Sequence, residues 1–423
     1  MLYHLYQWLQ SEGLKIPGIG IFQFITFRSM MAILLSLFIT LVYGKRIILF
    51  LQKKQVGESV RELGLQGEEQ KKGTPTMGGF IILLGILIPT LLFANLDKVY
   101  IKLLLLSTVW LGLVGFVDDY LKLRAKRLSQ EQGIPYKKGD KDGLAGWFKV
   151  LGQVGLGIII SITLLFNDNV KVMREYKGNN KPANATVVKF QGGERYFVKA
   201  NEPVTTIPFI KNHEFNYARL LPAGLRQYGW VVYMLVIIFI VTAVSNGANI
   251  TDGLDGLATG VSAIIGVCLA LFAYASGNLI FADYLNIMYI PNLGEVSIFI
   301  AAMIGACIGF LWYNTYPAQV FMGDTGSLAL GGIIASLAIM VRKELLIPIF
   351  CAVFLVENLS VIIQVSYFKY TKKKYGEGRR VFLMSPLHHH FQKKGYHESK
   401  IAVRFWIITL LFVVFAVMSL KMR

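Results

Sequence analysis

Cysteine and charged residues are both scarce in this chain of 423 residues, and each scarcity excludes a class of protein. The only cysteines are Cys268, Cys307 and Cys351, which all lie within apolar stretches and show no CxxC spacing. This excludes a disulfide scaffold and favours packing residues over a redox or metal site. Charged residues make up 16 % of the chain and hydrophobic residues 54 %. Such a composition does not fit the two or three soluble domains that the length alone would predict.

The apolar residues come in runs of about 20, which is the length that crosses a bilayer as a helix. We therefore predict an all-α polytopic integral membrane protein, with a single transmembrane domain over residues 1–423. The beginning of the chain lacks the basic region and cleavage site of a secretory signal peptide, so the first run is expected to stay in the mature protein. The ten predicted spans are 22–43, 77–96, 100–120, 147–166, 229–248, 256–276, 296–315, 326–341, 345–369 and 400–420.

The chain carries 43 Lys and Arg against 25 Asp and Glu, a formal charge of +18. The basic residues gather between apolar runs, which is typical of membrane topology and of contact with anionic lipid head groups, so a nucleic-acid partner is not expected. With ten spans, the basic loops 44–76, 121–146 and 370–399 fall on one side. That side is predicted to be cytoplasmic, which places both termini in the periplasm.

One long loop, 167–228, is predicted on the outer, periplasmic side. Its segments TVVKF and ERYFVKA alternate like strands, with Gly192 and Gly193 between them, and predict a small β-hairpin. No residue pattern in this loop indicates chemistry.

Acidic residues occur where a membrane protein rarely has them, at the ends of apolar runs. They are Asp118 and Asp119 in VGFVDDYLK, Asp252 and Asp255 in NITDGLDGLA, and Asp324 in FMGDTGS. A carboxylate within the bilayer costs roughly 2.5–3.5 kcal/mol on insertion scales, so such residues usually serve ion pathways, metals or catalysis. Hard divalent cations such as Mg²⁺ prefer oxygen ligands and commonly bridge protein to phosphate. The pattern indicates a membrane enzyme that handles a phosphate substrate.

The local sequence around these acids supports function over a structural role. Asp118 and Asp119 are expected at a helix C-terminus, where acids oppose the helix dipole and would not be chosen as caps. Spacings of three place Asn249, Asp252 and Asp255 along one helix face, if the segment is helical. Asp324 precedes a new span, where an N-cap and an anion site are compatible.

Two further polar motifs lie between the spans. KKGTPTMGG at 71–79 contains Lys71 and Thr76 but does not have the spacing of a Walker A loop. SPLHHHF at 385–391 holds three consecutive histidines, which cannot easily ligate one metal in regular structure. Donation of hydrogen bonds to phosphate or sugar is the favoured role for His388, His389 and His390. In the ten-span topology, every one of these motifs falls on the cytoplasmic face.

Taken together and in this order, KKGTPTMGG, the Asp118–Asp119 pair, NITDGLDGLA, FMGDTGS and PLHHHF resemble the polyprenyl-phosphate N-acetylhexosamine-1-phosphate transferase superfamily. The resemblance covers nearly the whole chain. The uninterrupted histidine triplet is similar to that of the branch that transfers phospho-N-acetylmuramoyl-pentapeptide. One departure is Gln392, which stands where family members often have Glu.

The resemblance implies transfer of phospho-N-acetylmuramoyl-pentapeptide from its UDP carrier to undecaprenyl phosphate, in the first membrane step of peptidoglycan synthesis. The products would be lipid I and UMP, and Mg²⁺ is the implied cofactor, with Asp324 as its direct ligand. The implied catalytic residues are Asp118, Asp119, Asp252, Asp324, Lys71 and His389. The implied substrate-binding residues are Thr76, Asn249, Gly253, Leu254, Asp255, Asn314, Phe321, His388 and His390.

Several alternatives remain open at this stage. The same fold could use UDP-N-acetylglucosamine, although the intact histidine triplet argues against it. A cation-coupled transporter would carry acids in mid-span and on both faces, which the pattern does not show. The reaction could proceed by direct attack of the lipid phosphate, with or without Asp118 as a base, or through an aspartyl-phosphate. A homodimer is also left open.

Overall fold

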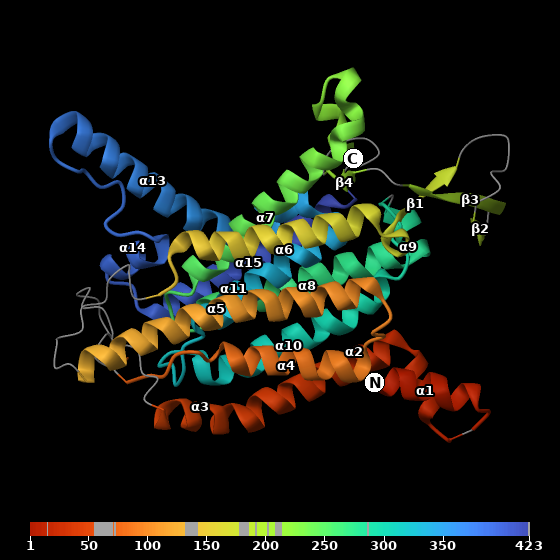
Figure 1. The fold of residues 1–423 in the computed structure, drawn as a ribbon, viewed down its shortest axis with the longest axis horizontal. Helices are drawn as coiled ribbons and strands as arrows, with labels where there is room; N and C mark the ends of the chain where they lie inside the picture. Colours follow the sequence, from red (N-terminus) through yellow and green to blue (C-terminus); the bar gives the residue numbers. More distant parts are fainter. Residues whose placement is uncertain are drawn as a thin grey trace.

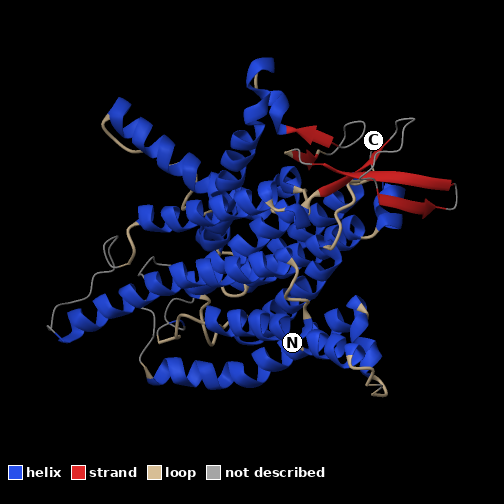
Figure 2. Ribbon diagram, turned by 45° about the vertical axis from the view of Figure 1, so that its right-hand side comes forward, coloured by secondary structure: helices blue, strands red, loops and turns tan. Residues whose placement is uncertain are grey.

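The computed structural model is an α-helical bundle with a small group of strands at one end (Figures 1 and 2). It describes residues 1–14, 16–54, 71, 73–131, 143–176, 186–190, 193–200, 203–207, 214–285 and 287–421. Among these, nine helical stretches are long and apolar enough to cross a bilayer, and a shorter apolar helix spans Gly79–Phe93. The chain is thus a polytopic, all-α membrane protein, as the sequence predicts.

The helices of the first half are α1 (Leu2–Ser11), α2 (Ile25–Phe38), α3 (Gly44–Lys53), α4 (Gly79–Phe93), α5 (Val99–Glu131), α6 (Gly146–Phe166) and α7 (Gly229–Thr251). Those of the second half are α8 (Leu257–Gly277), α9 (Leu279–Leu285), α10 (Val296–Asn314), α11 (Gly323–Met340), α12 (Ile347–Phe350), α13 (Ala352–Tyr375), α14 (Leu387–Lys393) and α15 (Glu398–Ser419). The strands are β1 (Val172–Tyr176), β2 (Thr186–Phe190), β3 (Gly193–Ala200), β4 (Val204–Thr206) and β5 (Glu214–Asn216).

Each predicted span corresponds to one of these helices except 345–369, which is divided at Cys351 into the short α12 and the long α13. Several ends were also predicted wrongly. The helix predicted over 22–43 continues through a π-helical turn, Ile39–Tyr43, into α3, so the basic loop begins after Lys53 and not at residue 44. The span predicted over 77–96 is the short helix α4, which at 1.5 Å per residue reaches only about 22 Å of the roughly 30 Å bilayer core. In the other direction, α5 continues well beyond residue 120.

The predicted β-hairpin is present and belongs to a larger sheet. Strand β2 pairs antiparallel with β3, with Phe190 opposite Gly193, and β3 also pairs with β1. The residues between β2 and β3 lie outside the described part of the chain. A second, two-stranded sheet joins β4 to β5. The sheets and α9 lie at the end of the bundle away from α14 (Figure 1).

The centre of the bundle is α11, which is buried almost throughout and lies between α5 and α7. Small residues permit this close packing. A Cβ added to Gly115 of α5 would lie 2.1 Å from the carbonyl oxygen of Asp324, at the beginning of α11. The backbones of the two helices therefore touch beside the acidic residues.

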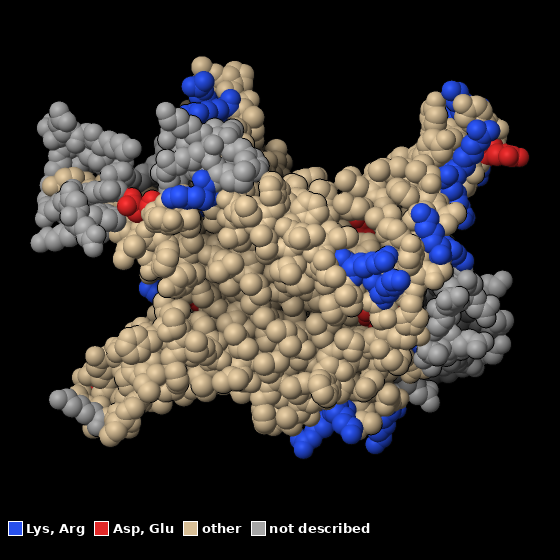
Figure 3. Space-filling model, turned by 180° about the vertical axis from the view of Figure 1, so that it is seen from behind, with Lys and Arg blue, Asp and Glu red and all other residues tan. Residues whose placement is uncertain are grey.

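Charge is distributed as a bilayer requires. Figure 3 shows Lys and Arg side chains toward the ends of the molecule and a broad uncharged middle on that face. Both ends of the described chain lie opposite the acidic residues: the Met1 ammonium contacts the Leu91 carbonyl near the end of α4, and Lys421 contacts Tyr284 of α9. Which side of the membrane this end faces stays a prediction.

Candidate functional site

Two lysines and two aspartates from three helices form the charged centre of the site. Lys122 of α5 contacts Asp118 Oδ2 at 2.6 Å and Asp324 Oδ2 at 3.0 Å. Lys149 of α6 contacts the same two oxygens at 2.9 and 2.6 Å. The other oxygen of Asp118 accepts the backbone N–H of Leu144 at 2.7 Å. Two ammonium groups thus hold the two carboxylates together. Asp118 and Lys122 lie within α5, whereas Lys149 and Asp324 lie in the first turns of α6 and α11.

Asp119 is buried and faces the beginning of α11. Its carboxylate accepts hydrogen bonds from the backbone N–H groups of Asp324 and Thr325, at 3.2 and 2.9 Å, and from the Thr325 hydroxyl at 2.7 Å. These N–H groups have no partner within the helix, so Asp119 caps α11 from another helix. The prediction that Asp324 is itself the N-cap is wrong, because Asp324 lies inside the first turn after Gly323.

The dipole argument for the aspartate pair was also wrong. Helix α5 does not end at Asp119 but continues to Glu131, so neither acid lies at a helix C-terminus. Polar residues after position 119 do not stop the helix, since Lys, Leu, Arg and Ala are all good helix formers. The pair is instead placed where α5 meets the first turn of α11.

The spacing of Asn249, Asp252 and Asp255 predicted that they share one helix face, and this prediction was wrong. Helix α7 ends at Thr251, with Asp252 at its C-cap, and a turn carries the chain from there into α8. Asn249 donates to Asp324 Oδ1 and to the Ser327 hydroxyl, both at 2.8 Å. Asp255 points to a different cluster, built around Lys71.

Lys71 lies between two carboxylates, Asp255 at 2.9 Å and Glu398 of α15 at 2.7 Å. Burial opposes its charge, but the two acids outweigh burial and hold the pKa of Lys71 above its usual value. The second oxygen of Asp255 accepts the backbone N–H of Ala318. The ammonium also lies 5.9 Å from the centre of the Phe321 ring, within range of a cation–π contact.

The segment that follows Lys71 runs beside the segment that precedes α11. The N–H of Phe321 donates to the Pro75 carbonyl, and those of Gly78 and Gly79 donate to the carbonyls of Phe321 and Met322, at 2.8–2.9 Å. This pairing holds half-buried Thr76 beside Met77, whose φ of 68° is strained for a residue with a side chain. The motifs at 71–79 and 321–327 are therefore one structural unit.

The three histidines have three different environments. His388 is buried against Gly253, and its Nδ1 lies 3.1 Å from Glu357 Oε2 of α13, although the pair lacks hydrogen-bond geometry. His389 Nδ1 lies 2.6 Å from Gln392 Oε1. His390 Nδ1 accepts the backbone N–H of Leu383. Burial lowers the pKa of His389 to about 4, with help from the nearby His388 and Lys71.

Two other predicted substrate residues are committed to internal structure. The amide of Asn314 donates to the Val320 carbonyl, and its oxygen accepts from the Gly256 N–H and the Thr259 hydroxyl. Asn314 thus ties the end of α10 to the beginning of α8. Leu254 is buried in the turn between α7 and α8, where exposed Gly253 lies beside it.

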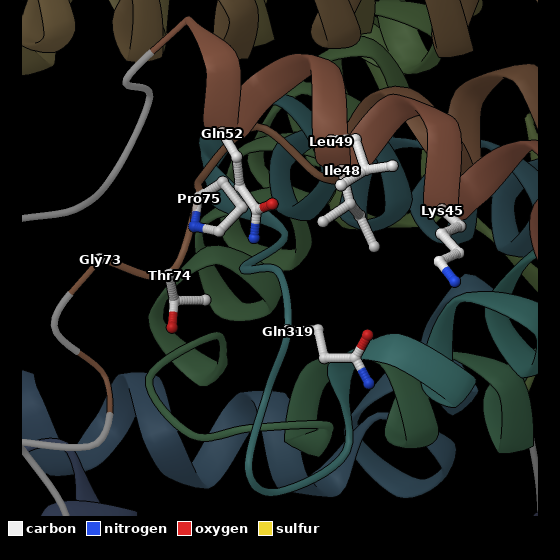
Figure 4. A pocket seen from close by; sticks show the side chains of 8 residues that line it. All are labelled: Lys45, Ile48, Leu49, Gln52, Gly73, Thr74, Pro75 and Gln319. Atoms are coloured by element: carbon white, nitrogen blue, oxygen red, sulfur yellow. The ribbon is translucent and has the colours of Figure 1, made fainter.

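A cavity of about 340 Å³ opens beside this site. In Figure 4, side chains of α3 point toward the loop that carries Gln319 and toward the Thr74–Pro75 segment. Its lining residues are Lys45, Ile48, Leu49, Gln52, Gly73, Thr74, Pro75 and Gln319. None of them is acidic, so this cavity is distinct from the aspartate cluster.

The aspartate cluster fits a divalent cation. Asp118, Asp119 and Asp324 each offer an oxygen, and these oxygens all lie within 4.8 Å of one another. Three carboxylates are the hard donor set that Mg²⁺ and similar ions prefer. Lys122 and Lys149 already supply positive charge to two of these three carboxylates, those of Asp118 and Asp324, which indicates that the cluster favours a cationic partner.

Sequence reasoning missed several residues of the site. Lys122 lies four residues after Asp118, a spacing that pairs opposite charges on a helix, so it could have been found. Glu357 and Glu398 are acids within or beside apolar runs, the same signal that identified the aspartates. Lys149 gave only the weaker signal of a lone basic residue at the start of a span.

Comparison with known proteins agrees with this geometry. Residues 101–342 match the family described as glycosyl transferase family 4. A phospho-N-acetylmuramoyl-pentapeptide-transferase of Flavobacterium psychrophilum is 56 % identical over the full length of both chains. Proteins of the same name from Parabacteroides distasonis and Phocaeicola vulgatus are 53 % and 47 % identical, also over their full lengths. The chain belongs to glycosyl transferase family 4 and, within it, to the phospho-N-acetylmuramoyl-pentapeptide transferases.

Proposed function

We propose that this chain transfers phospho-N-acetylmuramoyl-pentapeptide from UDP to undecaprenyl phosphate, giving lipid I and UMP. The observation that carries the proposal is the charged centre, in which Lys122 and Lys149 bridge Asp118 of α5 and Asp324 of α11. A reaction between a diphosphate and a lipid phosphate brings like charges together and requires this kind of compensation. The names of the full-length relatives support the same substrates.

The lysines are the groups that would meet the phosphates. Their side chains remain partly accessible, with that of Lys122 38 % and that of Lys149 19 % exposed, whereas Asp118 and Asp119 are buried. Phosphate oxygens could therefore take the place of carboxylate oxygens around either ammonium. Asp119 would contribute indirectly, because its hydrogen bonds hold the first turn of α11 and with it Asp324.

Mg²⁺ would be held by Asp324, with Asp118 and Asp119 beside it, and when bound it supplies charge neutralisation for the transferred phosphoryl group. Lys71 would serve the donor at the neighbouring cluster, where Asp255 and Glu398 fix its position. The other catalytic and substrate-binding residues named from the sequence are retained in this proposal, with Asp119 acting through the position of Asp324 and with Lys122 and Lys149 added.

The geometry favours direct attack by the lipid phosphate. Both oxygens of Asp118 already accept hydrogen bonds from protein donors, namely Leu144 N–H, Lys122 and Lys149. Its carboxylate is thus committed to orienting the lysines. A single displacement inverts configuration at the transferred phosphorus, whereas a route through an aspartyl-phosphate retains it. A chiral phosphorothioate donor therefore decides between them.

The site end of the bundle is proposed to face the cytoplasm of a bacterium, with the chain in the inner membrane and both termini in the periplasm. The ends of α3, α5 and α13, which carry the basic residues Lys53, Arg127 and Lys372, lie at this end of the bundle and support the orientation (Figure 1). Cysteines placed at residue 147 and at residue 284, probed with an impermeant thiol reagent in whole cells, test it. Labelling at 147 and not at 284 would contradict the proposed orientation.

The reaction is tested with purified protein, undecaprenyl phosphate and Mg²⁺, by following UMP release. UMP release with UDP-N-acetylmuramoyl-pentapeptide and not with UDP-N-acetylglucosamine is the expected result. Release only with UDP-N-acetylglucosamine would keep the reaction type and overturn the substrate. No release with either donor, from protein that remains folded, would overturn the proposed function.

A further inference from the structure

A chain of polar contacts connects the histidine motif to Lys71. His389 Nδ1 lies 2.6 Å from Gln392 Oε1, and Gln392 Nε2 lies 2.8 Å from Glu398 Oε1. The other oxygen of Glu398 accepts from Lys71 at 2.7 Å. The contacts run from α14 to the beginning of α15 and on to the segment before α4.

The chemistry of these groups determines which one donates and which one accepts in each hydrogen bond. Glu398 pairs with the Lys71 ammonium, so it is a carboxylate and can only accept. Gln392 must therefore turn its NH₂ toward Glu398, which leaves its oxygen facing His389. An amide oxygen cannot donate, so the proton of this contact belongs to His389 Nδ1. In the neutral imidazole, Nε2 is then a bare acceptor.

His390 has the opposite arrangement. Its Nδ1 accepts the backbone N–H of Leu383 at 3.1 Å, so in the neutral ring the proton is on Nε2. Two adjacent histidines therefore offer different groups at the same ring position: His389 offers an acceptor and His390 offers a donor. Among the described residues, neither Nε2 has a hydrogen-bond partner, and both side chains are only half-buried.

We infer that Gln392 and Glu398 are positioning residues that fix His389 as a hydrogen-bond acceptor, which takes an O–H or N–H group of the nucleotide-sugar donor. This inference rests on the proposed function and makes it more specific. It differs from the role expected from the sequence, in which the triplet donates hydrogen bonds to phosphate or sugar. It also gives Gln392 a function of its own, since Glu at this position could not donate to Glu398.

The charges around His389 agree with a neutral ring. His388 and the Lys71 ammonium both lie close enough to oppose a second proton, and burial acts in the same direction, so the pKa is about 4. The nearest acids on the packed elements are engaged elsewhere: Glu357 of α13 faces His388, and Glu398 of α15 faces Lys71 and Gln392. His389 is thus neutral across the physiological pH range.

The test is ¹⁵N NMR of the full chain, labelled only at histidine and held in lipid nanodiscs without substrate. The His389 resonances are assigned by their loss in His389→Asn. We expect Nδ1 protonated and Nε2 bare at pH 7 in the native protein. In Gln392→Leu, which removes the acceptor at Nδ1, the population should move toward the Nε2-protonated form. Gln7→Leu on α1, at the far end of the bundle, is the matched control and should leave the His389 resonances unchanged.

Kinetics supply a second readout. Loss of one hydrogen bond from the donor should raise its KM by up to about tenfold in Gln392→Leu, with kcat nearly unchanged. A native His389 protonated on Nε2 or on both nitrogens at pH 7 would overturn the inference, and so would an unchanged donor KM in Gln392→Leu. The NMR measurement needs no substrate. It therefore tests the protonation of His389 even if UMP release shows that the donor is a different one.

Discussion

Asp119 and Thr325 are joined by two hydrogen bonds, one from the backbone N–H of Thr325 at 2.9 Å and one from its hydroxyl at 2.7 Å. One carboxylate thereby caps a helix that begins two hundred residues later in the chain. The acid that the sequence predicts as catalytic therefore also holds the turn that carries Asp324.

Asp119→Asn tests this role. The amide nitrogen cannot accept, so we expect a loss of about 1–3 kcal/mol in the free energy of unfolding, together with reduced UMP release. Thermal unfolding in detergent and the activity assay measure the two effects. Thr325→Ser, which keeps the hydroxyl, is the control and should stay close to the native protein. An inactive Asp119→Asn variant of native stability would assign Asp119 to the chemistry itself.

Asp324→Asn is expected to lower turnover at least about 100-fold, because a neutral amide contributes much less to divalent cation binding than a carboxylate. Membrane insertion should be unaffected. Asp97→Asn, an exposed position between α4 and α5, is the matched control. Turnover that survives in Asp324→Asn at saturating Mg²⁺ would exclude Asp324 as the ligand.

Lys122→Gln should change metal affinity and turnover in opposite directions. The Lys122 ammonium competes with a cation for the oxygens of Asp118 and Asp324, so its removal should tighten Mn²⁺ binding by about tenfold. Turnover should fall, since phosphate loses a partner. Mn²⁺ binding followed by electron paramagnetic resonance measures the first effect. Weaker Mn²⁺ binding in the variant would show that the lysine supports the metal site instead of competing for it.

Lys343, at the opposite end of the bundle, should make the free energy of unfolding depend on pH. It is fully buried, donates to Thr206, and has its pKa lowered from 10.5 to about 7, mainly by burial. Between these values the unfolded chain holds a proton that the folded protein has released. The free energy of unfolding should therefore rise with pH from about 7 toward 10, by an amount on the order of a few kcal/mol. Thermal unfolding of Lys343→Met should show a smaller slope with pH, and an equal slope would refute the assignment.

Replacement of residues 183–200 by a short linker should spare catalysis. The β2–β3 strands lie at the end of the bundle away from α14, so they cannot contact the charged centre (Figure 1). Some stability should be lost, because β3 also pairs with β1. UMP release by the purified deletion variant measures the outcome. A folded but inactive variant would show that the sheet matters for the reaction.

The fold was largely predictable, because apolar runs and basic loops report membrane spans directly. The errors lie at helix ends. Lys, Arg and Leu, all good helix formers, follow soon after Asp119 and, beyond Gly44, after Tyr43, so polarity marked the end of the apolar run and not of the helix. Hydropathy detects where a chain leaves the hydrocarbon, whereas backbone hydrogen bonding decides where a helix stops.

The site was predictable in its residue types and not in its connections. Spacing suggested that Asn249 and Asp255 act together, yet one contacts Asp324 and the other contacts Lys71. The turn after α7 separates them, and no local rule predicts its geometry. Long-range pairs such as Asp119 with Thr325, or Lys71 with Glu398, depend on helix packing that a single sequence does not reveal.

The pair Lys71–Glu398 joins residues 327 positions apart, and this separation affects how the protein is made. As the ribosome delivers the helices one after another, Lys71 enters the membrane region long before Glu398 has been synthesised. Asp255 arrives earlier and provides a first partner, but Glu398, which links Lys71 to Gln392, is added only with α15. The nascent chain therefore cannot assemble this part of the site, or use it, until its insertion is nearly complete.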